Sequence, residues 1–493
     1  MEHTITRRQL LAQGAAAAAV LAGARSIFTP PTRGEAQPAR VIVAGAGLAG
    51  LAAAFELVKR RHEVTVLEAR ERPGGRVHTL RGELDGGLYV EAGAVYVPDH
   101  HHHTVGYARE LGVALAPAGP RARGGGERYF VHGRSIPIRR GERPSWPVDL
   151  APAERGLPPW MLLARYVDPV LEEIGDPLHP GWPGEAALRY DGVSFAELLR
   201  SRGASDGAVS LMRLGYLDEW GDGIDRVSAL FLLRDLALRR GARETYVVAG
   251  GSDHLPRAFA AKLGTRIRYG AEVTAIEHGD EGVRVEVAER GARRMLAADF
   301  LVCAIPFTTL RRVRVSPPLS PEKRRATEGL RTTSITRVYL QVRERCWGEE
   351  GAAIPTDLPI MHAVDASVGQ PGPRAVLEAF ISGPSARRVA AMEPDARVAF
   401  AGRYAEQLHP GIARRFERGA SYCWDADPWA RGDYAWFAPG EMQAFLPHLA
   451  RPEGRIHFAG DHTSATPGWM QGALASGVRA ADEVHAAAAK LAS

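Results

Sequence analysis

The pattern of apolar positions near the start of the chain predicts a strand, a helix and a second strand in close succession. Residues 41–43 form a short apolar run, and residues 64–67 form another. Between them, apolar side chains recur at helical spacing from Leu51 to Val58. A tight turn rich in glycine separates the first strand from the helix. This order predicts the opening βαβ unit of a parallel sheet.

The turn contains Gly45, Gly47 and Gly50 in the spacing GxGxxG. The first glycine permits a sharp turn, the second lets backbone approach a pyrophosphate, and the third lets helix and strand pack closely. Glu68 ends the second strand, where a carboxylate can accept hydrogen bonds from a ribose 2′-hydroxyl and would repel a 2′-phosphate. The fingerprint predicts a dinucleotide site but leaves NAD and FAD open.

Further along, the periodicity changes with each region of the chain. Helical patterns dominate 152–243, and the predicted helices cover 161–173, 195–202, 208–217 and 227–239. Strands are predicted at 267–269, 273–276, 283–287 and 300–305, and a small-residue helix at 474–488. Residues 336–342 and 375–381 alternate apolar and polar positions, which indicates strands of a half-buried mixed sheet.

A second glycine-rich segment lies near the C-terminus. A short strand runs into Gly460 and Asp461, and Gly468, Trp469 and Met470 precede the last helix. Backbone N–H groups at a helix start, with one carboxylate beside them, can bind the phosphate and ribityl groups of a cofactor. The segment is therefore predicted to be a second half-site for the same cofactor.

The first 36 residues are predicted to lie outside the fold. Arg7 and Arg8 precede an Ala-rich apolar run at 14–24, and 34–36 reads Gly-Glu-Ala. This order resembles a bacterial twin-arginine signal peptide, which implies export to the periplasm or beyond; a disordered basic tail is the alternative. The run is too short for a permanent membrane anchor, so we expect no stable membrane insertion.

Composition narrows the function further. The chain has 493 residues, of which 45% are apolar and 24% charged, as in soluble globular proteins. The formal net charge is +5, yet Arg and acidic residues alternate, so we expect no nucleic-acid partner. Cys303, Cys346 and Cys423 are far apart and odd in number, which argues against a disulfide framework.

Two clusters of ionisable residues could each have a functional role. Four histidines, 100–103, suggest a metal site, but consecutive side chains diverge and no second ligand cluster is evident. We expect no metal there, and instead the start of a helix near an active-site entrance. The acidic cluster Asp218, Glu219, Asp222 and Asp225 could recruit a cationic substrate, or could simply be a solvated helix end.

Three blocks then carry a family resemblance. The segment 72–76, Arg-Pro-Gly-Gly-Arg, resembles the extension that FAD proteins of the glutathione-reductase type have after the ribose acid. The three blocks 45–76, 304–324 and 455–484 make the chain, over 39–488, similar to the flavin-dependent amine oxidases: monoamine oxidase, polyamine oxidase, L-amino acid oxidase and flavin-type lysine demethylases.

The resemblance implies an α/β fold with four parts. After the signal peptide (1–36) it implies a Rossmann-like FAD-binding domain (39–115, 245–310 and 446–490), a mixed-sheet substrate domain (116–150 and 311–445) and an inserted helical region (151–244). It also implies oxidation of an amine C–N bond by hydride transfer to flavin N5, with O2 reduced to hydrogen peroxide and the imine hydrolysed. The partners are then a small amine or amino acid and O2; the oligomeric state stays open, with a homodimer among the alternatives.

Site residues follow from the matched motifs. Trp469 and Tyr434 match two aromatic walls that hold a neutral amine beside the flavin. The positions expected to contact FAD are Gly45, Gly47, Gly50, Glu68, Gly75, Arg76, Gly93, Ala94, Val273, Trp424, Gly460, Asp461, Gly468, Trp469 and Met470.

Three departures from the family pattern sharpen the expectation. Asp433 replaces the cysteine that tethers flavin in monoamine oxidase, so FAD should be non-covalent. Tyr96 replaces the arginine that grips the substrate carboxylate in L-amino acid oxidases, which favours an amine without an α-carboxylate; an L-amino acid oxidase using another arginine is the alternative. Arg337 replaces the lysine that assists reaction with O2, so the reoxidation rate is in question.

Arg337, Trp469, Tyr434 and Tyr96 are the predicted catalytic residues. Two other functions remain open on this sequence. A flavin desaturase or dehydrogenase acting on a C–C bond shares the first and last blocks, although it does not need the aromatic pair. A non-catalytic FAD-binding protein is the other alternative.

Overall fold

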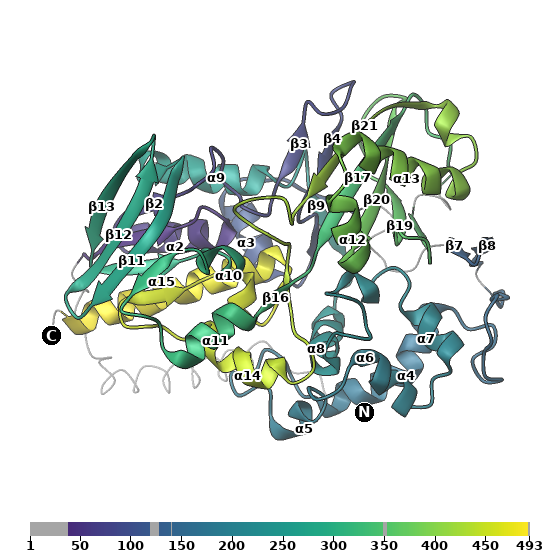
Figure 1. Cartoon of the computed structure of the whole chain (residues 1–493), viewed down its shortest axis with the longest axis horizontal. Coiled ribbons are helices and arrows are strands. Elements are labelled where there is room, and N and C mark those ends of the chain that lie inside the picture. The colour runs from purple at the N-terminus through teal and green to yellow at the C-terminus, as the bar shows by residue number, and fades with distance from the viewer. Residues whose placement is uncertain (1–37, 119–127, 140, 349–352, 492–493) are drawn as a thin grey trace, which may run out of the picture.

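The computed structural model describes residues 38–118, 128–139, 141–348 and 353–491 (Figure 1). Its central element is a five-stranded parallel sheet in the order β10-β2-β1-β14-β23. The strands are β1 (Arg40–Ala44), β2 (Glu63–Leu67), β10 (Ile267–Arg268), β14 (Phe300–Cys303) and β23 (Ile456–Phe458). Because they come from three distant parts of the chain, the sheet brings the first glycine motif beside the C-terminal Gly460-Asp461 segment.

Helices rich in small residues pack against this sheet. The predicted helix after the glycine turn is α2 (Leu48–Lys59), and the predicted C-terminal helix is α15 (Met470–Leu491), which lies along it (Figure 1). Gly477 of α15 approaches α2 so closely that a Cβ there would collide with the carbonyl oxygen of Ala49. The small residues therefore allow the two helices to pack at close range.

A second sheet, with order β13-β12-β11-β15, flanks the parallel one at the far left of Figure 1. It comprises β11 (Ala271–Gly279), β12 (Gly282–Glu289), β13 (Ala292–Ala298) and β15 (Arg314–Ser316). The predicted strands at 273–276 and 283–287 are the middles of β11 and β12. The backbone N–H of Ala271 donates to the carbonyl of Glu68 at 2.8 Å, which places the start of β11 next to the predicted ribose site.

The substrate-domain sheet differs from the expectation. Its order is β18-β19-β20-β17-β21, formed by β17 (Ile335–Val342), β18 (Ala353–Pro355), β19 (His362–Asp365), β20 (Ala375–Ser382) and β21 (Phe416–Cys423). All its pairings are antiparallel, and β17 and β20 are almost entirely buried. The prediction of a half-buried mixed sheet was therefore wrong for this part of the chain.

The reason lies in what covers each face. Val338, Leu340 and Val342 of β17 pack in one core with residues of α12 (Gly383–Ala390) and α13 (Pro394–Leu408). The alternating polar residues Arg337 and Tyr339 face the opposite way and bond to the backbone of Glu91. The alternation thus separates a helix-covered face from a face turned toward the interior cavity, and neither faces solvent.

The region predicted to be helical is helical. It contains α4 (Pro159–Glu173), α5 (Glu185–Leu188), α6 (Phe195–Ser201), α7 (Asp206–Met212) and α8 (Ala229–Arg239). Helix α7 ends earlier than predicted because Gly215 adopts a φ of 81°, and a short 3-10 turn, η2 (Leu217–Glu219), follows. Figure 1 shows this region below the antiparallel sheet.

Shorter elements connect these parts. Strands β5 (Tyr96–Pro98), β9 (Thr245–Val248) and β6 (Leu115–Pro117) form a three-stranded sheet. The remaining strands are β3 (Thr79–Arg81), β4 (Tyr89–Glu91), β7 (Arg128–Val131), β8 (Arg134–Pro137), β16 (Arg331–Thr332) and β22 (Ala435–Trp436). The remaining helices are α3 (His102–Glu110), α9 (His254–Leu263), α10 (Phe307–Leu310), α11 (Pro321–Gly329), α14 (Glu441–Leu449), η3 (Gly264–Arg266), η5 (Ile412–Arg414) and η6 (Asp461–Thr463).

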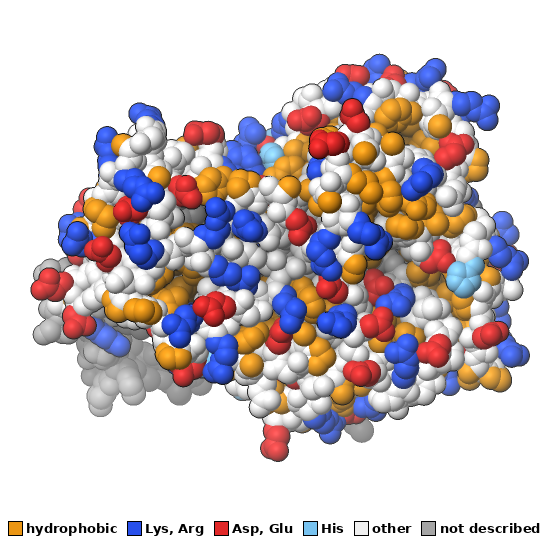
Figure 2. All heavy atoms as spheres, in the orientation of Figure 1, with side chains coloured by type: hydrophobic (Ala, Val, Ile, Leu, Met, Phe, Trp, Pro, Cys, Tyr) orange, Lys and Arg blue, Asp and Glu red, His pale blue; other side chains and the backbone are white. Residues whose placement is uncertain are grey.

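The α/β fold class with a parallel nucleotide-binding type of sheet is confirmed, while the exact domain limits stay a prediction. The predicted signal peptide lies outside the described residues. Within the described ranges, no helix combines the length and apolar character needed to cross a membrane. On the face shown in Figure 2, Lys and Arg side chains are interspersed with Asp and Glu.

Candidate active site

One large cavity runs through the centre of the molecule and has a volume of about 1470 Å³. Single ligands typically occupy roughly 300–1000 Å³, so this cavity can hold a cofactor together with a substrate. Its lining extends from Glu68 and Val273 at one end to Tyr434 and Trp469 at the other. All the predicted site residues line it except Gly50 and Trp424.

The glycine turn forms one wall of the cavity. Gly45 has a φ of 106°, which favours glycine, and a Cβ at Gly50 would lie 1.9 Å from the carbonyl oxygen of Gly45. Gly50 therefore serves the packing of helix on turn. A Cβ at Gly47 would meet no atom within 4 Å, since Gly47 faces the cavity. This open backbone at the start of α2 fits a pyrophosphate.

Glu68 lies beside this turn, at the end of β2. Its carboxylate accepts the N–H of Ala46 at 2.7 Å and that of Arg70 at 2.9 Å, so the acid also holds the glycine turn in place. Burial raises the pKa of Glu68, against the opposing effect of these hydrogen bonds. The side chain lines the cavity and can accept hydrogen bonds from a ribose.

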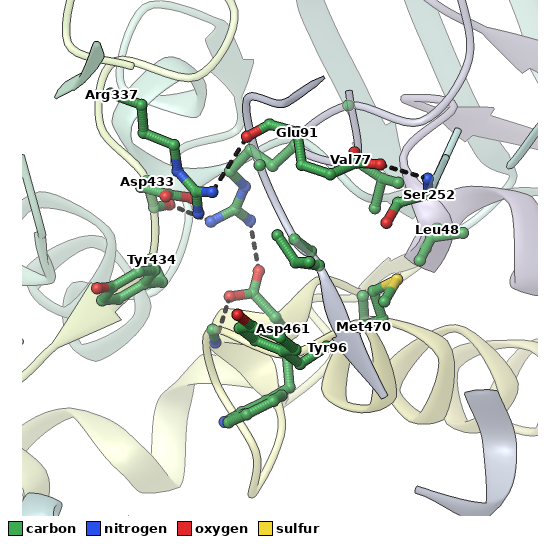
Figure 3. Close-up of a pocket in the computed structure, with 18 of the residues that line it drawn as sticks. Leu48, Val77, Glu91, Tyr96, Ser252, Arg337, Asp433, Tyr434, Asp461 and Met470 are labelled. Carbon is green, nitrogen blue, oxygen red and sulfur yellow. Dashed lines mark hydrogen bonds and ion pairs between the residues drawn. The ribbon is translucent and has the colours of Figure 1, made fainter. Parts of the chain in front are cut away.

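The second half-site meets the first through an ion pair. Arg76 pairs with Asp461 and also donates to the carbonyl of Asp433, while the N–H of Gly468 donates to Asp461 at 2.9 Å (Figure 3). Burial works to raise the pKa of Asp461, but Arg76 and His462 hold it well below its usual range. Asp461 is therefore an anion that joins residues from both ends of the chain.

Trp424, predicted to contact FAD, does not line the cavity, because the backbone of residues 92–94 lies between its ring and the cavity. Its side chain is fully buried, and its Nε1–H donates to the carbonyl of Ala92 at 2.7 Å. A Cβ at Gly93 would lie 3.2 Å from its ring. Trp424 thus supports the backbone of Gly93 and Ala94, which do line the cavity.

Arg337 is held on several sides. Its Nη1 donates to the carbonyl of Glu91 at 3.1 Å and lies 3.3 Å from Oε1 of Glu378, and its Cζ lies 5.1 Å from the ring centre of Phe380. Burial lowers the pKa of Arg337, but the combined charges of Glu378, Tyr339, Asp433 and Tyr434 outweigh this effect, and the pKa is raised. Figure 3 shows the guanidinium pointing toward Glu91 and Asp433.

Tyr434 and Trp469 line the end of the cavity where the sequence predicts that the substrate binds, which is called the substrate end below. The hydroxyl of Tyr434 donates to the carbonyl of Glu219 at 2.8 Å, and its ring packs edge-on against Trp220. Trp469 packs edge-on against His101 at 4.9 Å between ring centres. Gly468 lies against Tyr434, since a Cβ there would be 3.3 Å from the Cβ of Tyr434. Tyr434 and the segment carrying Trp469 are thus neighbours.

Comparison with known proteins decides the family. The model of the flavin-containing amine oxidoreductases matches residues 48–485. The chain belongs to this family. "Putative L-amino-acid oxidase YobN" of Bacillus subtilis (strain 168) is 31% identical to it over 91% of this chain and 95% of its own length. The L-amino-acid oxidase of Demansia vestigiata is 28% identical over 94% and 90%.

Solved structures of amine oxidases share the fold. Wild-type putrescine oxidase bound to putrescine matches with a TM-score of 0.77, covering 91% of this chain and 99% of its own at 22% identity. Cyclohexylamine oxidase from Brevibacterium oxydans matches with a TM-score of 0.74, covering 92% and 99% at 23% identity. At these identities the likeness concerns the fold. Membership of the flavin-containing amine oxidoreductases implies a flavin cofactor and an enzymatic role.

By resemblance, Asp433 is expected at the position where monoamine oxidase has its flavin-bonded cysteine. It is buried, and burial raises the pKa of its carboxyl to about 6 against the opposing effect of Arg76 and Arg337. Neither Cys303, Cys346 nor Cys423 is among the residues that line the cavity.

Three residues of the amine oxidoreductase site were missed by the sequence analysis. Asp235 and Arg239, one turn apart on α8, and Tyr216 cluster around Trp469 at the substrate end. The helical pattern of α8 was recognised, but the pattern alone does not say which residues of the helix end turn toward a cavity. Asp235 and Arg239 form a charged i, i+4 pair next to Arg234 and Arg240, and such a pair is common on solvent-exposed helices, so the sequence did not mark it as part of a site.

The acidic cluster divides between two roles. Asp218 and Asp225 pair with Arg213, and Asp222 pairs with Arg387. Glu219 lines the cavity and lies 3.4 Å from Nδ1 of His362. Burial raises the pKa of Glu219 to about 8, although Arg239 and Arg337 act to lower it.

The histidine tract begins a helix, as predicted. Helix α3 starts at His102, and His101 precedes it. Burial, followed by the charge of His100, lowers the pKa of His101 to about 3, so this ring is neutral where it packs on Trp469. Tyr96, on β5, lines the cavity at the same end.

Proposed function

We propose that the protein is an FAD-dependent oxidase that converts the C–N bond of a primary or secondary amine into an imine. One observation carries the proposal: a single cavity joins the cradle formed by Gly47, Glu68 and Asp461 to the aromatic residues Tyr434 and Trp469. These cradle residues would hold FAD, and the chemistry that FAD would supply there is uptake of a hydride from the amine carbon and transfer of two electrons to O2, which with two protons becomes hydrogen peroxide. Water then hydrolyses the imine to a carbonyl compound and ammonia or an amine.

The residues of the chain position the substrate. Tyr434 is fixed by its hydrogen bond to the carbonyl of Glu219, and Trp469 is fixed by Asp235 and His101. Rings held in this way can orient a neutral amine by dipole and π contacts, so that its C–H points in one direction. Such positioning needs no strong acid or base at the reacting carbon.

A proton acceptor is also present. An ammonium substrate must lose a proton before its C–N bond can be oxidised. The Glu219 carboxyl lies in the cavity, and its pKa of about 8 places its change of charge near neutral pH. We infer that its ionised form, which predominates above about pH 8, takes up this proton.

Non-covalent attachment of FAD is part of the proposal. Asp433 offers no sulfur nucleophile at the family's tether position, and the cavity lining within the described residues contains no cysteine. Acid precipitation of the purified protein should release a yellow supernatant. Flavin retained in the pellet would contradict this claim.

Anaerobic mixing with a panel of amines and amino acids tests the activity itself. A substrate should bleach the flavin absorbance, and the same compound should yield hydrogen peroxide in air. Absence of bleaching by every amine and amino acid would favour a non-catalytic protein or a desaturase acting on a C–C bond. The aromatic residues at the substrate end support the amine, because a polyene or porphyrinogen site does not require them.

An L-amino acid oxidase is the second candidate. It draws support from the names of the curated relatives and from the position of Arg239, a guanidinium in the same cavity. Tyr96, in place of the usual carboxylate-binding arginine, speaks for a simple amine.

Export by the twin-arginine route is proposed from residues 1–36 alone. Replacing both Arg7 and Arg8 by lysine should hold the protein in the cytoplasm. Cell fractionation followed by immunoblotting reads this outcome, and undiminished export of the double variant would exclude the route.

A further inference from the structure

Arg239, at the end of α8, presents a guanidinium to the substrate end of the cavity. Its Nε–H donates to Oδ2 of Asp235 at 3.0 Å, one helical turn back. Its Cζ lies 3.6 Å from the ring centre of Tyr216 and 4.7 Å from that of Trp469. The group is therefore held by an ion pair on one edge and by two aromatic rings.

The outer edge of this guanidinium is open. The side chain is 36% exposed and lines the cavity. Among the residues that the structure describes, Nη1 and Nη2 of Arg239 make no hydrogen bond or ion pair of their own. Two N–H-bearing nitrogens thus remain for a ligand.

Two other arginines of the cavity lining, Arg337 and Arg76, already have buried partners. Arg337 is bound to Glu378 and to the carbonyl of Glu91, and Arg76 to Asp461 and the carbonyl of Asp433. Neither can turn its guanidinium to a new anion without giving up a buried ion pair, which is costly.

Asp235 holds the arrangement together. It is 7% exposed and accepts hydrogen bonds from the Tyr216 hydroxyl, from Arg239 and, at 3.4 Å, from Nε1 of Trp469. One buried carboxylate thus fixes the guanidinium relative to the aromatic residue that faces the substrate. A pre-oriented planar fork of this kind matches a carboxylate, which it can bind through two parallel hydrogen bonds.

We propose that Arg239 binds the carboxylate of the substrate and that the substrate is an α-amino acid. This rests on the proposed oxidation of an amine and, of the two candidate substrate classes named above, selects the amino acid over the amine without a carboxylate. Because Arg239 lies directly against Trp469, a carboxylate bound to it stays close to the reacting amine. In an α-amino acid only one carbon separates the two groups. The guanidinium that Tyr96 lacks on β5 is then supplied from α8.

The first test compares matched substrates in the FAD-loaded enzyme. Flavin reduction is followed anaerobically with three pairs: L-phenylalanine and 2-phenylethylamine, L-leucine and 3-methylbutylamine, and L-lysine and 1,5-diaminopentane. Arg239→Gln should raise the concentration giving half-maximal reduction by on the order of 10- to 100-fold for the amino acid, since a charge-assisted pair is lost. For the matching amine it should change less than about threefold, because that substrate makes no such pair.

Arg240→Gln is the matched control. It removes a guanidinium from the neighbouring position, where Arg240 pairs with Asp168 and Glu172 and lies outside the cavity lining. Arg240→Gln should leave the concentration giving half-maximal flavin reduction unchanged for both the amine and the amino acid of each pair. The inference would be overturned if Arg239→Gln raised the half-maximal concentration equally for the amine and the amino acid. It would also be overturned if the parent enzyme preferred the amine.

A second test does not depend on turnover. Benzoate should raise the thermal unfolding temperature of the parent holoenzyme more than benzamide does, and Arg239→Gln should abolish the difference while Arg239→Lys retains part of it. If benzoate acts equally on parent and Arg239→Gln, the inference fails. If benzoate discriminates but no compound bleaches the flavin, the carboxylate site stands and the proposed oxidation fails.

Discussion

Arg337 Nη1 lies 3.3 Å from Glu378 Oε1, on neighbouring strands β17 and β20. The carbonyl of Glu91 and the ring of Phe380 hold the same guanidinium from other sides. By resemblance, other members have a lysine here that holds a water at the flavin and assists the reaction with O2. A guanidinium fixed by a buried carboxylate is not free to hold that water in the same place.

Arg337→Lys should therefore speed reoxidation of the reduced enzyme by O2, because a compact ammonium can approach the position where negative charge develops. Arg337→Met should slow reoxidation or leave it unchanged. Both variants should keep a nearly intact reductive half-reaction. Stopped-flow mixing of the reduced enzyme with O2 measures the rate constant directly.

Slower reoxidation in Arg337→Lys would mean that the arginine has itself taken over the role, or that β17 is aligned wrongly with the family lysine. Anaerobic reduction of each variant serves as the control. A variant that fails there has lost more than its oxygen reaction.

Glu68→Ala should weaken FAD binding by on the order of 1–3 kcal/mol through loss of hydrogen bonds to the ribose. The carboxylate also accepts the N–H of Ala46 and of Arg70, so part of the loss will come from a looser glycine turn. Glu63→Ala, at the exposed start of the same strand, is the control. Fluorescence titration of apoprotein with FAD gives both dissociation constants, and equal affinity of Glu68→Ala and parent would remove the ribose role.

The glycine turn and the position of Glu68 beside it could be predicted from the sequence because their determinants are local. Gly45, Gly47, Gly50 and Glu68 act within one βαβ unit, where spacing along the chain fixes spacing in the fold. At the other end of the cavity, Tyr96, Tyr434 and Trp469 were predicted only through the family resemblance, and Arg239 was missed. Arg239 acts through contacts with Tyr216 and Trp469, which a helical periodicity cannot reveal.

The same limit explains the two structural differences. Alternation along β17 was attributed to a solvent-facing side, whereas Arg337 and Tyr339 face the interior. Trp424 was expected beside the flavin, but its ring lies behind the backbone of Gly93. In both cases the sequence pattern left open what lies opposite the side chain.

Glu219 should make stability depend on pH. Its pKa is about 8 in the folded protein, mainly through burial, against about 4.5 for an exposed glutamate. Between these values the folded state holds a proton that the unfolded state has lost, so the stabilising contribution of protonated Glu219 is lost as pH rises toward 8. Glu219→Gln should therefore show a smaller fall in unfolding temperature from pH 5 to pH 8 than the parent.

Glu281→Gln, on the exposed turn between β11 and β12, is the control and should follow the parent curve. Scanning calorimetry of the holoenzymes at several pH values measures the difference. Parallel curves for parent and Glu219→Gln would show that the carboxyl is already ionised at pH 5.

Substitutions at two glycines of the same turn, Gly50 and Gly47, should distinguish an effect on folding from an effect on cofactor binding. At Gly50 a Cβ would lie 1.9 Å from the carbonyl oxygen of Gly45, so Gly50→Ala should force α2 away from the turn, lower the unfolding temperature and abolish FAD binding. At Gly47 the backbone is relaxed, with a φ of −68°, and a Cβ meets no atom within 4 Å. Gly47→Ala should therefore fold as stably as the parent apoprotein. It should still bind FAD at least tenfold more weakly, a loss of about 1.4 kcal/mol or more, because the methyl group takes the space that a pyrophosphate needs. Thermal unfolding of the apoproteins and FAD titration distinguish the two effects, and normal FAD affinity in Gly47→Ala would place the pyrophosphate elsewhere in the cavity.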